Sequence, residues 1–533
     1  MDIIKDPFFK ERTNLHHRSY PQEECSRTSF VLYVVTNTYR TQQNPALDVA
    51  TRMSRAFDVP LMVFLFFDDS IKFATQRRAR FVLEAVKEMQ ENLRREGVLH
   101  MFCCYRAGHR QPRHLTLASR ACVVVTDEPF VMPYTKVVSQ LTACGTPLIT
   151  VDNHCIFPAR SVPIAWTRRA YVFRAKTSAG RKKRLVDASY PYTEPLPAHL
   201  LVGSERVAEL QRSMSFSSSV DLTKTTISSA LTSMALDNSV RSVAHTPGGT
   251  SHARRRWREF LSKGGLKRYH KRRNDPLASG VSRLSAYLNL GMISPFQISR
   301  DVLDAMTRDP SIKPGGEKYL DEFWIWRELA HAMCFRYPKH LTLSSVLPNW
   351  ALETLRKHAN DPRRVVNVVD LEHGRTGLRL WDIAQRSLRD TGELHNNLRM
   401  TWGKEVLNWV AGSAQRTYET LVHLNDKFAL DGTSPPSYAG LLWCMGWADS
   451  PKPERPIFGR VRFRSASSIS RRYDLNALET RLCFDATRAS AVAPESTKQR
   501  SITQFFKRDA GGEPGSRGGE RGDTDSKRAR WVK

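Results

Sequence analysis

The first half of the chain alternates short, almost wholly apolar segments with longer amphipathic ones. The apolar segments are FVLYVVT (30–36), PLMVFLFF (60–67), HMFCCYR (100–106), ACVVVTD (121–127) and the short stretch 147–151. Residues 45–58 and 77–97, between them, have apolar residues at helical spacing. Near-continuous apolar strands separated by helices predict a parallel, doubly wound sheet with both faces covered. We therefore expect a Rossmann-like α/β domain over residues 30–200.

The remaining sequence divides by composition. Residues 1–29 precede the first strand and are expected to form an N-terminal extension. Residues 201–251 are rich in Ser and Thr, which predicts a flexible linker. Residues 252–488 have long helical patterns broken by Pro and Gly, and predict an all-helical domain. In residues 489–533 aromatic residues become sparse and Gly, Arg, Glu and Asp dominate, which predicts a disordered tail.

No glycine-rich phosphate-binding pattern follows the first strand, so we do not expect the α/β domain to bind a dinucleotide in the usual way. No apolar run is long enough to cross a bilayer, and Met1–Arg12 has no apolar signal region, so neither membrane insertion nor secretion is expected. Nine cysteines without a CxxC pair suit a reducing compartment and predict no metal site.

The chain is strongly basic. It has 82 Lys and Arg against 53 Asp and Glu, for a formal net charge of +29. Such an excess favours a polyanionic partner, and nucleic acid is the obvious one. The densest basic run, Arg254–Pro276, also contains Trp257, Phe260 and Tyr269, a mixture typical of phosphate-contacting surfaces. The alternative is a solvated helix face.

Several motifs after this run occur in a characteristic order. They are RNDP (273–276), SRLSAYLNLGMIS (282–294), EFWIWRELAHAMCF (322–335), LWDIAQRSLRDTGELHNNLRMTWGKEVLNW (380–409), LNDKFALDG (424–432) and ERPIFGRVRF (454–463). Together they resemble the class II photolyases of the photolyase/cryptochrome superfamily. The similarity continues in the first half through Arg40, Asn44, VVTDEPFVMPYTKVV (124–138) and VDNHCIFP (151–158).

The resemblance implies an α/β antenna domain followed by an all-helical domain that binds FAD, active as FADH−. The residues that match flavin-binding positions are Tyr269, Ser282, Leu284, Ser285, Asn425 and Asp431. Hydroxyl and backbone N–H groups at a helix start suit a pyrophosphate, because the helix dipole favours anions there. For Asn425 and Asp431 the alternative is an ordinary helix end followed by a turn. A second, antenna chromophore, a deazaflavin or a folate, is left open.

Trp381, Trp402 and Trp409 match the tryptophans that relay electrons to the photoexcited flavin in class II photolyases. Trp402 and Trp409 are seven residues apart and therefore share one helix face. The alternative is core packing, the usual role of such pairs.

The substrate side is implied by the same resemblance. Glu328 matches a glutamate that hydrogen-bonds the pyrimidine dimer, and its alternative is a buried ion pair with Arg327 or a neighbouring Arg. Met400 and Trp443 match apolar contacts to the dimer, and Arg273 and Asn274 match residues that line the site. Aromatic faces would replace the stacking that a flipped-out lesion loses.

The implied activity is that of a deoxyribodipyrimidine photo-lyase, a carbon–carbon lyase that acts on UV-damaged double-stranded DNA. Two other hypotheses remain: a cryptochrome-like photoreceptor without repair activity, and a flavin-free nucleic-acid-binding scaffold. The first draws on departures from the class II pattern at Ala286, Asn289, 433–437 and 444–450.

The tail contains QRSITQFF (499–506), which resembles a peptide that binds the sliding clamp, proliferating cell nuclear antigen. Gln499 would make polar contacts, and Ile502, Phe505 and Phe506 would enter an apolar pocket. Basic pairs at 507–508 and 527–530 would suit nuclear import. We therefore expect a monomeric nuclear protein.

Overall fold

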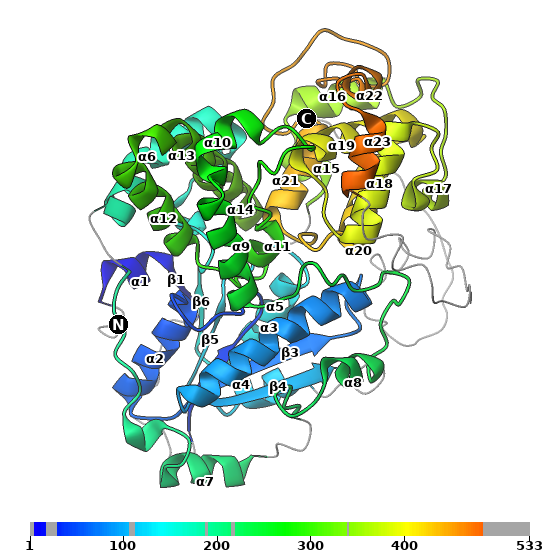
Figure 1. Ribbon diagram of the computed structural model, residues 1–533. Coiled ribbons are helices and arrows are strands. Elements are labelled where there is room, and N and C mark those ends of the chain that lie inside the picture. Colours follow the sequence, from blue (N-terminus) through cyan, green and yellow to red (C-terminus); the bar gives the residue numbers. More distant parts are fainter. Residues whose placement is uncertain are drawn as a thin grey trace, which may run out of the picture. The chain divides into compact units, whose positions relative to one another are not determined.

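A six-stranded sheet organises the first half of the protein in the computed structural model (Figure 1). The structure describes residues 5–16, 29–105, 112–186, 190–214, 219–337 and 341–482. The strands are β1 (Thr13–Leu15), β2 (Val31–Val34), β3 (Leu61–Asp68), β4 (Leu99–Tyr105), β5 (Val123–Asp127) and β6 (Leu148–Val151). Their order is β1-β6-β5-β2-β3-β4; β2 to β6 pair in parallel and β1 pairs antiparallel with β6. The predicted doubly wound sheet is confirmed.

Helices cover both faces of this sheet. The helices of the first half are α1 (Pro7–Arg12), α2 (Pro45–Phe57), α3 (Gln76–Arg95), α4 (Arg113–Ala118), α5 (Tyr134–Ala143), α6 (Ala170–Val186), α7 (Glu205–Ser213) and α8 (Ile227–Thr232). Alternate residues of β2 enter different cores: Val31 and Tyr33 pack with α2 and α3, whereas Leu32 and Val34 pack with α4, α5 and α7. The side-chain period of two explains why the strands are apolar throughout.

The N-terminal residues are part of the fold, and not only an extension before it. Residues 5–16 form α1 and the edge strand β1. The guanidinium of Arg12 lies 4.0 Å from the ring centroid of Phe8 and 5.0 Å from that of Phe296, a residue of the second half. Arg12 also donates to the carbonyl oxygens of Asp152 and Cys155. This segment therefore joins both halves.

The segment predicted as a flexible linker differs from that expectation. Within residues 201–251 the described part contains α7 and α8, and Leu222, Leu231 and Val240 are buried. The Ser- and Thr-rich composition concealed these widely spaced apolar anchors: Leu222 and Leu231 pack in the core that contains α3, and Val240 packs in the core of the second half. Composition averages over a window, whereas packing needs only a few well-placed side chains.

The second half is helical, as predicted. Its helices are α9 (Thr250–Ser262), α10 (Gly265–Arg272), α11 (Ser285–Asn289), α12 (Pro295–Arg308), α13 (Lys313–Leu320), α14 (Glu328–Arg336), α15 (Leu343–Val346), α16 (Asn349–Lys357), α17 (Val368–His373), α18 (Arg379–Thr391), α19 (Asn396–Trp409), α20 (Ala414–Phe428), α21 (Pro435–Cys444), α22 (Ala466–Ser470) and α23 (Leu475–Leu482). A π-helical segment, η6 (Asp321–Arg327), joins α13 to α14.

A second core lies around α14 and α18 to α21, and it also includes Phe130, Cys155 and Phe173 of the first half. The predicted disordered tail, 489–533, lies outside the described residues. Among the residues that the structure describes, no helix is both long and apolar enough to cross a membrane.

The second half fills the crevice at the carboxyl ends of β2 and β5, where the strand order reverses. Asp127, at the end of β5, accepts hydrogen bonds from the backbone N–H of Thr36 and Asn37 at 2.8 and 2.9 Å. Gly291 (φ +56°) lies so close that a Cβ there would be 2.8 Å from Thr38 Cα. Ligands of doubly wound sheets bind at this position. In this protein Gly291 of the second half packs there, against the segment that follows β2.

Arg77, at the start of α3, connects the two halves. Its guanidinium donates to the carbonyl oxygens of Leu388 and Arg389, at the end of α18, at 3.2 and 2.6 Å. It also donates to the carbonyl oxygen of Phe428, at the end of α20, at 2.7 Å. A cation at a helix C-terminus is favourable, because the last carbonyls have no partner within the helix. Burial lowers the pKa of Arg77 to about 10, so it stays charged at neutral pH.

We predict that Arg77→Ala lowers the free energy of unfolding by about 3 kcal/mol, because three buried carbonyls lose a charged donor. Thermal unfolding followed by circular dichroism measures the effect. Arg80→Ala is the matched control, since Arg80 lies on the same helix and pairs with Glu84 at the surface, with 42% of its side chain exposed. An unchanged melting temperature in Arg77→Ala would contradict this role.

Candidate functional site

Three tryptophans from α18 and α19 form a continuous chain of contacts. The rings of Trp402 and Trp381 are nearly parallel, with an interplanar angle of 8° and centroids 6.2 Å apart, and Trp409 meets Trp381 edge-on at 5.1 Å. The indole N–H of Trp381 donates to the carbonyl oxygen of Trp402, and that of Trp402 donates to Gln385 Oε1. All three side chains are buried. They are core residues, as the alternative of core packing predicts. They also form an unbroken path of aromatic contacts.

A polar cluster begins one helical turn from Trp402. Arg399, three residues before Trp402 on α19, donates from Nη1 to Asn425 Oδ1 at 3.3 Å and from Nη2 to Asp431 Oδ1 at 2.8 Å. Residues three apart on a helix are neighbours. The structure thus brings together two predicted flavin-binding residues, Asn425 and Asp431, through an arginine that the sequence analysis did not single out. Its position in the motif LRMTW was the available signal.

Two of the other predicted flavin-binding residues, Ser282 and Tyr269, lie next to Tyr319. Ser282 Oγ lies 3.2 Å from Tyr319 Oη, and the rings of Tyr269 and Tyr319 are 5.0 Å apart. Burial raises the pKa of Tyr319 to about 12, so its hydroxyl keeps its proton. Arg327 is beside this phenol and donates from Nη1 to the carbonyl oxygen of His154.

The hydrogen bonding of Arg327 indicates whether this cluster could hold a phosphate-containing cofactor. Its Nη2 is buried, and no acceptor for it exists among the described residues. A buried guanidinium N–H without a partner costs free energy that an acceptor such as a flavin oxygen would recover. Leu284 is buried, whereas Ser285 is exposed and Ser282 half-buried, so both hydroxyls remain within reach of a ligand. The residues present therefore fit FAD.

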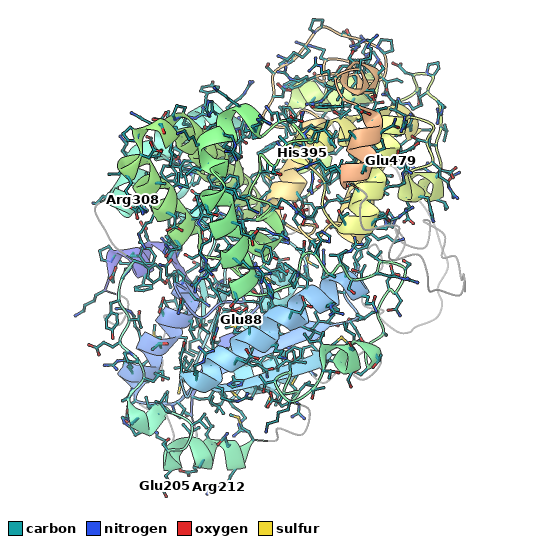
Figure 2. The ribbon with its side chains drawn as sticks, viewed as in Figure 1. Glu88, Glu205, Arg212, Arg308, His395 and Glu479 are labelled. Carbon is teal, nitrogen blue, oxygen red and sulfur yellow. The ribbon has the colours of Figure 1, made fainter. Side chains whose placement is uncertain are left out.

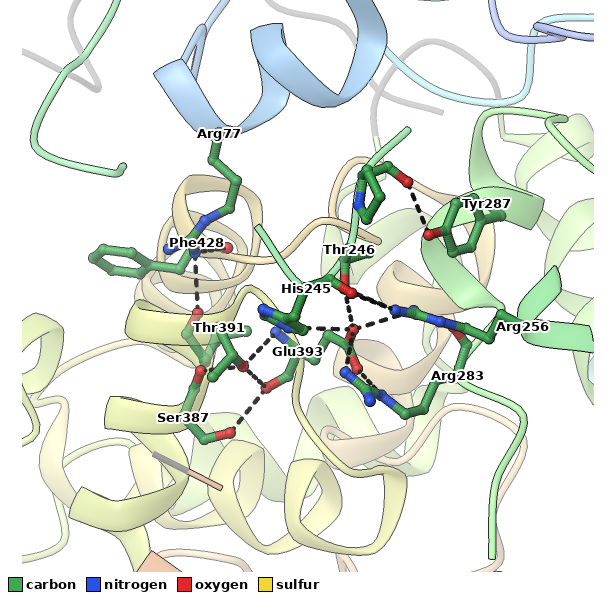
Figure 3. A network of polar contacts seen from close by, with 12 residues as sticks. Arg77, His245, Thr246, Arg256, Arg283, Tyr287, Ser387, Thr391, Glu393 and Phe428 are labelled. Carbon is green, nitrogen blue, oxygen red and sulfur yellow. Dashed lines mark hydrogen bonds and ion pairs between the residues drawn. The ribbon is translucent and has the colours of Figure 1, made fainter. Parts of the chain in front are cut away.

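Glu393 ties the Ser282–Ser285 turn to the segment before α9 (Figure 3). Arg283, in the left-handed region at φ 54°, donates to both Glu393 oxygens, at 2.6 and 2.9 Å. Thr246 donates to the same carboxylate at 2.9 Å, and Arg256 approaches it at 3.4 Å. Burial opposes the charge, but Arg283 and Arg256 outweigh it and hold the pKa of Glu393 below its usual value. The bidentate pair fixes a turn that a non-glycine residue rarely adopts.

Glu328 does not lie where the sequence analysis expected it. It begins α14, is 1% exposed, and accepts hydrogen bonds from the backbone N–H of Ile156 at 2.7 Å and of Phe157 at 3.3 Å. Arg181 on α6 donates to the same carboxylate at 3.2 Å. Burial raises the pKa of Glu328, against the effect of Arg181. Both oxygens are engaged between the two halves, which favours the alternative over the predicted substrate contact. The alternative, a buried ion pair with a neighbouring Arg, describes it.

The acidic side chain that does reach the predicted substrate residues is Glu322. It lies on η6, pairs with Arg273 at 2.9 Å and with Lys318 at 2.7 Å, and is 23% exposed. A π-helical segment holds one residue more per turn than an α-helix and is frequent at functional sites. The motif EFWIWREL contains two glutamates, and sequence reasoning selected the one in the more familiar RELA string.

Arg273 and Asn274 lie against the start of α19. Asn397 donates from Nδ2 to the carbonyl oxygen of Asn274 at 2.7 Å. His395, labelled in Figure 2, caps α19 by accepting from the Asn397 N–H. Burial next to Arg273 lowers the pKa of His395 to about 4, so its ring is neutral at pH 7. Sequence analysis missed both His395 and Asn397.

Met400 and Trp443 belong to helices that pack together. Met400 on α19 reaches Gly440 on α21, where a Cβ would lie 3.5 Å from its terminal methyl. The ring centroid of Trp443 is 5.3 Å from Lys404 Nζ. Both side chains are half-buried, so part of each remains open to a ligand. The two side chains lie on adjacent helices, so both can contact the same apolar ligand.

The basic run on α9 and α10 separates into two faces. Trp257, Phe260 and Tyr269 are buried in the core, so these aromatics do not contact phosphates at a surface. The exposed face carries Arg255, Arg258, Lys263, Lys267, Arg268, Lys271 and Arg272. An amphipathic pair of helices with one strongly cationic face remains suited to a polyanion. The predicted clamp-binding residues Gln499, Ile502, Phe505 and Phe506 lie outside the described residues.

Comparison with known proteins finds a family match in the first half of the chain and similar sequences over most of its length. Residues 31–198 match the DNA photolyase family model. A deoxyribodipyrimidine photo-lyase of Methanothermobacter thermautotrophicus is 28% identical over 467 residues, which cover 86% of this chain and 96% of that enzyme. A deoxyribodipyrimidine photo-lyase of Potorous tridactylus is 26% identical over 506 residues, covering 90% of this chain and 86% of that one.

Solved structures share the fold. A class III photolyase from Agrobacterium tumefaciens superposes with a TM-score of 0.60 at 18% identity, over 87% of this chain and 88% of that one. A cryptochrome from Synechocystis gives 0.60 at 16% identity, over 86% and 90%. The chain therefore has the fold of photolyases and cryptochromes, and the family match with the two relatives supports membership of that superfamily. The two relatives that match it over nearly their whole length are deoxyribodipyrimidine photo-lyases, which supports that enzyme class.

We predict that Glu328→Gln lowers the free energy of unfolding by about 3 kcal/mol, because it leaves Arg181 buried without its counter-charge. Glu322→Gln, the matched control, should change it by less than about 1 kcal/mol, since its ion pairs are partly solvated. Chemical denaturation of both variants measures the difference. Equal stability of the two would contradict the structural role of Glu328.

Proposed function

We propose that this chain is a deoxyribodipyrimidine photo-lyase of the class II type, which uses blue or near-UV light to split cyclobutane pyrimidine dimers in DNA. The observation that carries the proposal is the contact chain Trp402–Trp381–Trp409. Buried tryptophans alone are ordinary core. An aromatic path that ends one turn from Arg399, with Asn425 and Asp431 bound to it, has the form that an electron relay to a flavin needs.

FAD, active as FADH−, is the proposed cofactor, and it supplies the light-driven electron transfer. Ser282, Ser285, Leu284 and Tyr269 would hold its phosphates and ribityl chain, and the free N–H of Arg327 supports an anionic or carbonyl oxygen nearby. Arg399 and Asp431 would face its polar rim. A deazaflavin or folate antenna remains an open addition.

The protein's own residues exclude water from the site and supply fixed charges. The core around the tryptophans excludes water and lowers the local dielectric, which favours electron transfer between fixed groups. The ion pair of Arg399 with Asp431 supplies preorganised charge that need not rearrange during the reaction. No general base or nucleophile would be required, since a bound flavin would supply and take back the electron that opens the cyclobutane ring.

DNA is the proposed substrate. The cationic face of α9 and α10 would neutralise phosphates. Arg273 and Asn274, beside α19, and the half-buried Met400 and Trp443 would receive the lesion once it leaves the base stack, a step that photolyases are known to use. For the carboxylate that hydrogen-bonds the dimer we propose Glu322 in place of Glu328, because Glu322 is the acid paired with Arg273.

The test is repair by purified protein with chemically reduced flavin. An oligonucleotide with one thymine dimer should regain intact thymines under blue light and not in darkness, as measured by chromatography. A flavin-containing protein that never restores thymines would instead be a cryptochrome-like photoreceptor.

Trp402→Phe should repair at nearly the wild-type rate when its flavin is reduced beforehand. Its light-driven reduction of oxidised flavin should be slower than in wild type by more than about tenfold. Unchanged photoreduction would remove Trp402 from the relay.

We also propose that the tail, 499–506, binds the sliding clamp in the nucleus and that the protein acts as a monomer. The motif QRSITQFF and the basic residues near 507–508 and 527–530 support this. Phe505→Ala/Phe506→Ala should reduce clamp binding in a pull-down by at least about tenfold, since paired aromatic anchors dominate such contacts. Repair of naked DNA by the same variant is the control and should not change. Full clamp binding by the variant would contradict the assignment.

A further inference from the structure

Helix α6 and the segment that leads into it carry a second concentration of cations. From η2 (Ala159–Ser161) through η3 (Ile164–Arg168) to the end of α6, the sequence has nine Arg and Lys and no Asp or Glu. Five of these cations are exposed: Arg168, Arg174, Lys176, Lys182 and Lys183. Neither the proposed lesion site nor the basic face of α9 and α10 accounts for them.

The two sides of α6 differ in burial. The buried side consists of residues four apart, which lie above one another on a helix: Phe173, Thr177, Arg181 and Leu185. The opposite side is exposed and carries Tyr171, Ala175, Ser178 and Lys182. Tyr171 and Lys182 are about 16 Å apart along the helix axis, because each residue adds about 1.5 Å. Only small side chains lie between them on this side, so an extended ligand can approach the helix closely.

Tyr171 is an exposed aromatic residue on an ordered backbone. Its side chain is 67% exposed, and Ile164 on η3, which packs against α6, is 42% exposed. Arg336 on α14 fixes the chain just before η3: it donates from Nε to the carbonyl oxygen of Val162 and from Nη2 to that of Arg160, both at 2.8 Å. A ring that is already held at the surface can stack on a ligand without first ordering the chain around it.

An ion-pair network on η6 connects α6 to the residues of the proposed lesion site. Arg174 pairs with Asp321 at 2.6 Å, and Arg273 pairs with Glu322 at 2.9 Å. Lys318 bridges these two adjacent acids, at 3.0 and 2.7 Å. Three cations thus surround two carboxylates, so no net negative charge separates the α6 surface from Arg273.

Three lysines of α6 have charges that the protein itself does not neutralise. Lys176, Lys182 and Lys183 make no ion pair or hydrogen bond within the part of the chain that the structure describes. Lys176 and Lys183 are seven residues apart and therefore share one side of the helix, next to the strip of small residues. Exposed cations around an exposed ring are the combination with which proteins bind the backbone and bases of a single nucleic-acid strand.

We propose that the surface of η3 and α6 is a second nucleic-acid-binding site, which takes single-stranded DNA without a lesion. Its lysines contact phosphates, and Tyr171 stacks on one base. A duplex suits this surface less well, because its bases are stacked on one another and offer no free face to the ring. The choice of DNA over RNA rests on the proposed function, since the network on η6 leads from this surface to Arg273. Binding itself needs neither flavin nor light.

Fluorescence anisotropy of the full chain with a short labelled oligothymidylate, in the dark, tests the proposal. Tyr171→Ala should weaken binding by at least about fivefold, as the loss of one stacked base implies. Tyr171→Phe keeps the ring and should stay within about twofold of wild type. Tyr192→Ala is the matched control, because Tyr192 is 75% exposed but lies beside α2, where Arg52 donates to its carbonyl oxygen. Equal binding by Tyr171→Ala and wild type would overturn the proposal.

The phosphate contacts have a separate signature in the salt dependence of binding. The logarithm of the binding constant falls linearly with that of the salt concentration, with a slope of about −0.7 for each phosphate contacted on a single strand. The variant Lys176→Ala/Lys182→Ala/Lys183→Ala should therefore have a slope that is shallower by about 2. A slope equal to that of wild type would show that these lysines do not contact phosphates, and the proposal would fail.

Three further probes distinguish other occupants of this surface. The affinity for a duplex of the same sequence should fall by less than about twofold in Tyr171→Ala; an equal loss for duplex and single strand would overturn the proposal, because the ring would then not stack on a free base. Tighter binding of oligouridylate than of oligothymidylate would also overturn it. So would binding to phosphatidylserine vesicles that depends on Tyr171 while oligonucleotide binding does not. Failure to repair dimers would instead contradict the proposed function and leave the loss of binding in Tyr171→Ala unaffected.

Discussion

Guanidinium groups that donate to backbone carbonyls join the two halves of this protein. Arg77 reaches the carboxyl ends of α18 and α20, and Arg40 donates to the carbonyls of Gly291 and Asn153. Because α18 carries Trp381 and α20 carries Asn425, the α/β half determines how the aromatic path stands relative to the polar cluster. Carbonyl partners suit this task, since they bring no second charge that must also be desolvated.

Much of the fold could be predicted from the sequence. The apolar strands of residues 30–151 are buried on both faces, and that pattern has few other solutions. The helical character of the second half could also be predicted, as could the shared helix face of Trp402 and Trp409 from their seven-residue spacing. The segment 201–251 was not, because its few buried side chains, such as Leu222 and Val240, are scattered among Ser and Thr.

The site was predicted less completely, for a different reason. Position within a motif identifies a residue but not the direction of its side chain. Glu328 stands in a familiar string, yet it points between the halves toward Arg181. Arg399 and His395 lie inside a recognised block, yet only tertiary contacts reveal that they meet Asn425 and Arg273.

Buried carboxylates organise the interior. Asp127, Glu328 and the half-buried Glu393 each accept hydrogen bonds from segments distant in the chain, and Asp426 accepts them from the turn between α20 and α21. Each fully satisfied carboxylate specifies one arrangement of loops, because the alternative arrangements leave a charge unpaired. In this strongly basic chain, a few acidic residues thus fix the positions of interior loops.

The π-helical turn η6 has a consequence for how this site can change. An α-helix advances by about 100° per residue, so removing one residue from 321–327 would rewind the segment and swing Glu322 away from Arg273 while α14 stayed in place. The number of residues in this segment, and not only their types, therefore determines where the Glu322 side chain points. A homologue that lacks one residue of this segment would keep the glutamate, but its side chain would point in a different direction.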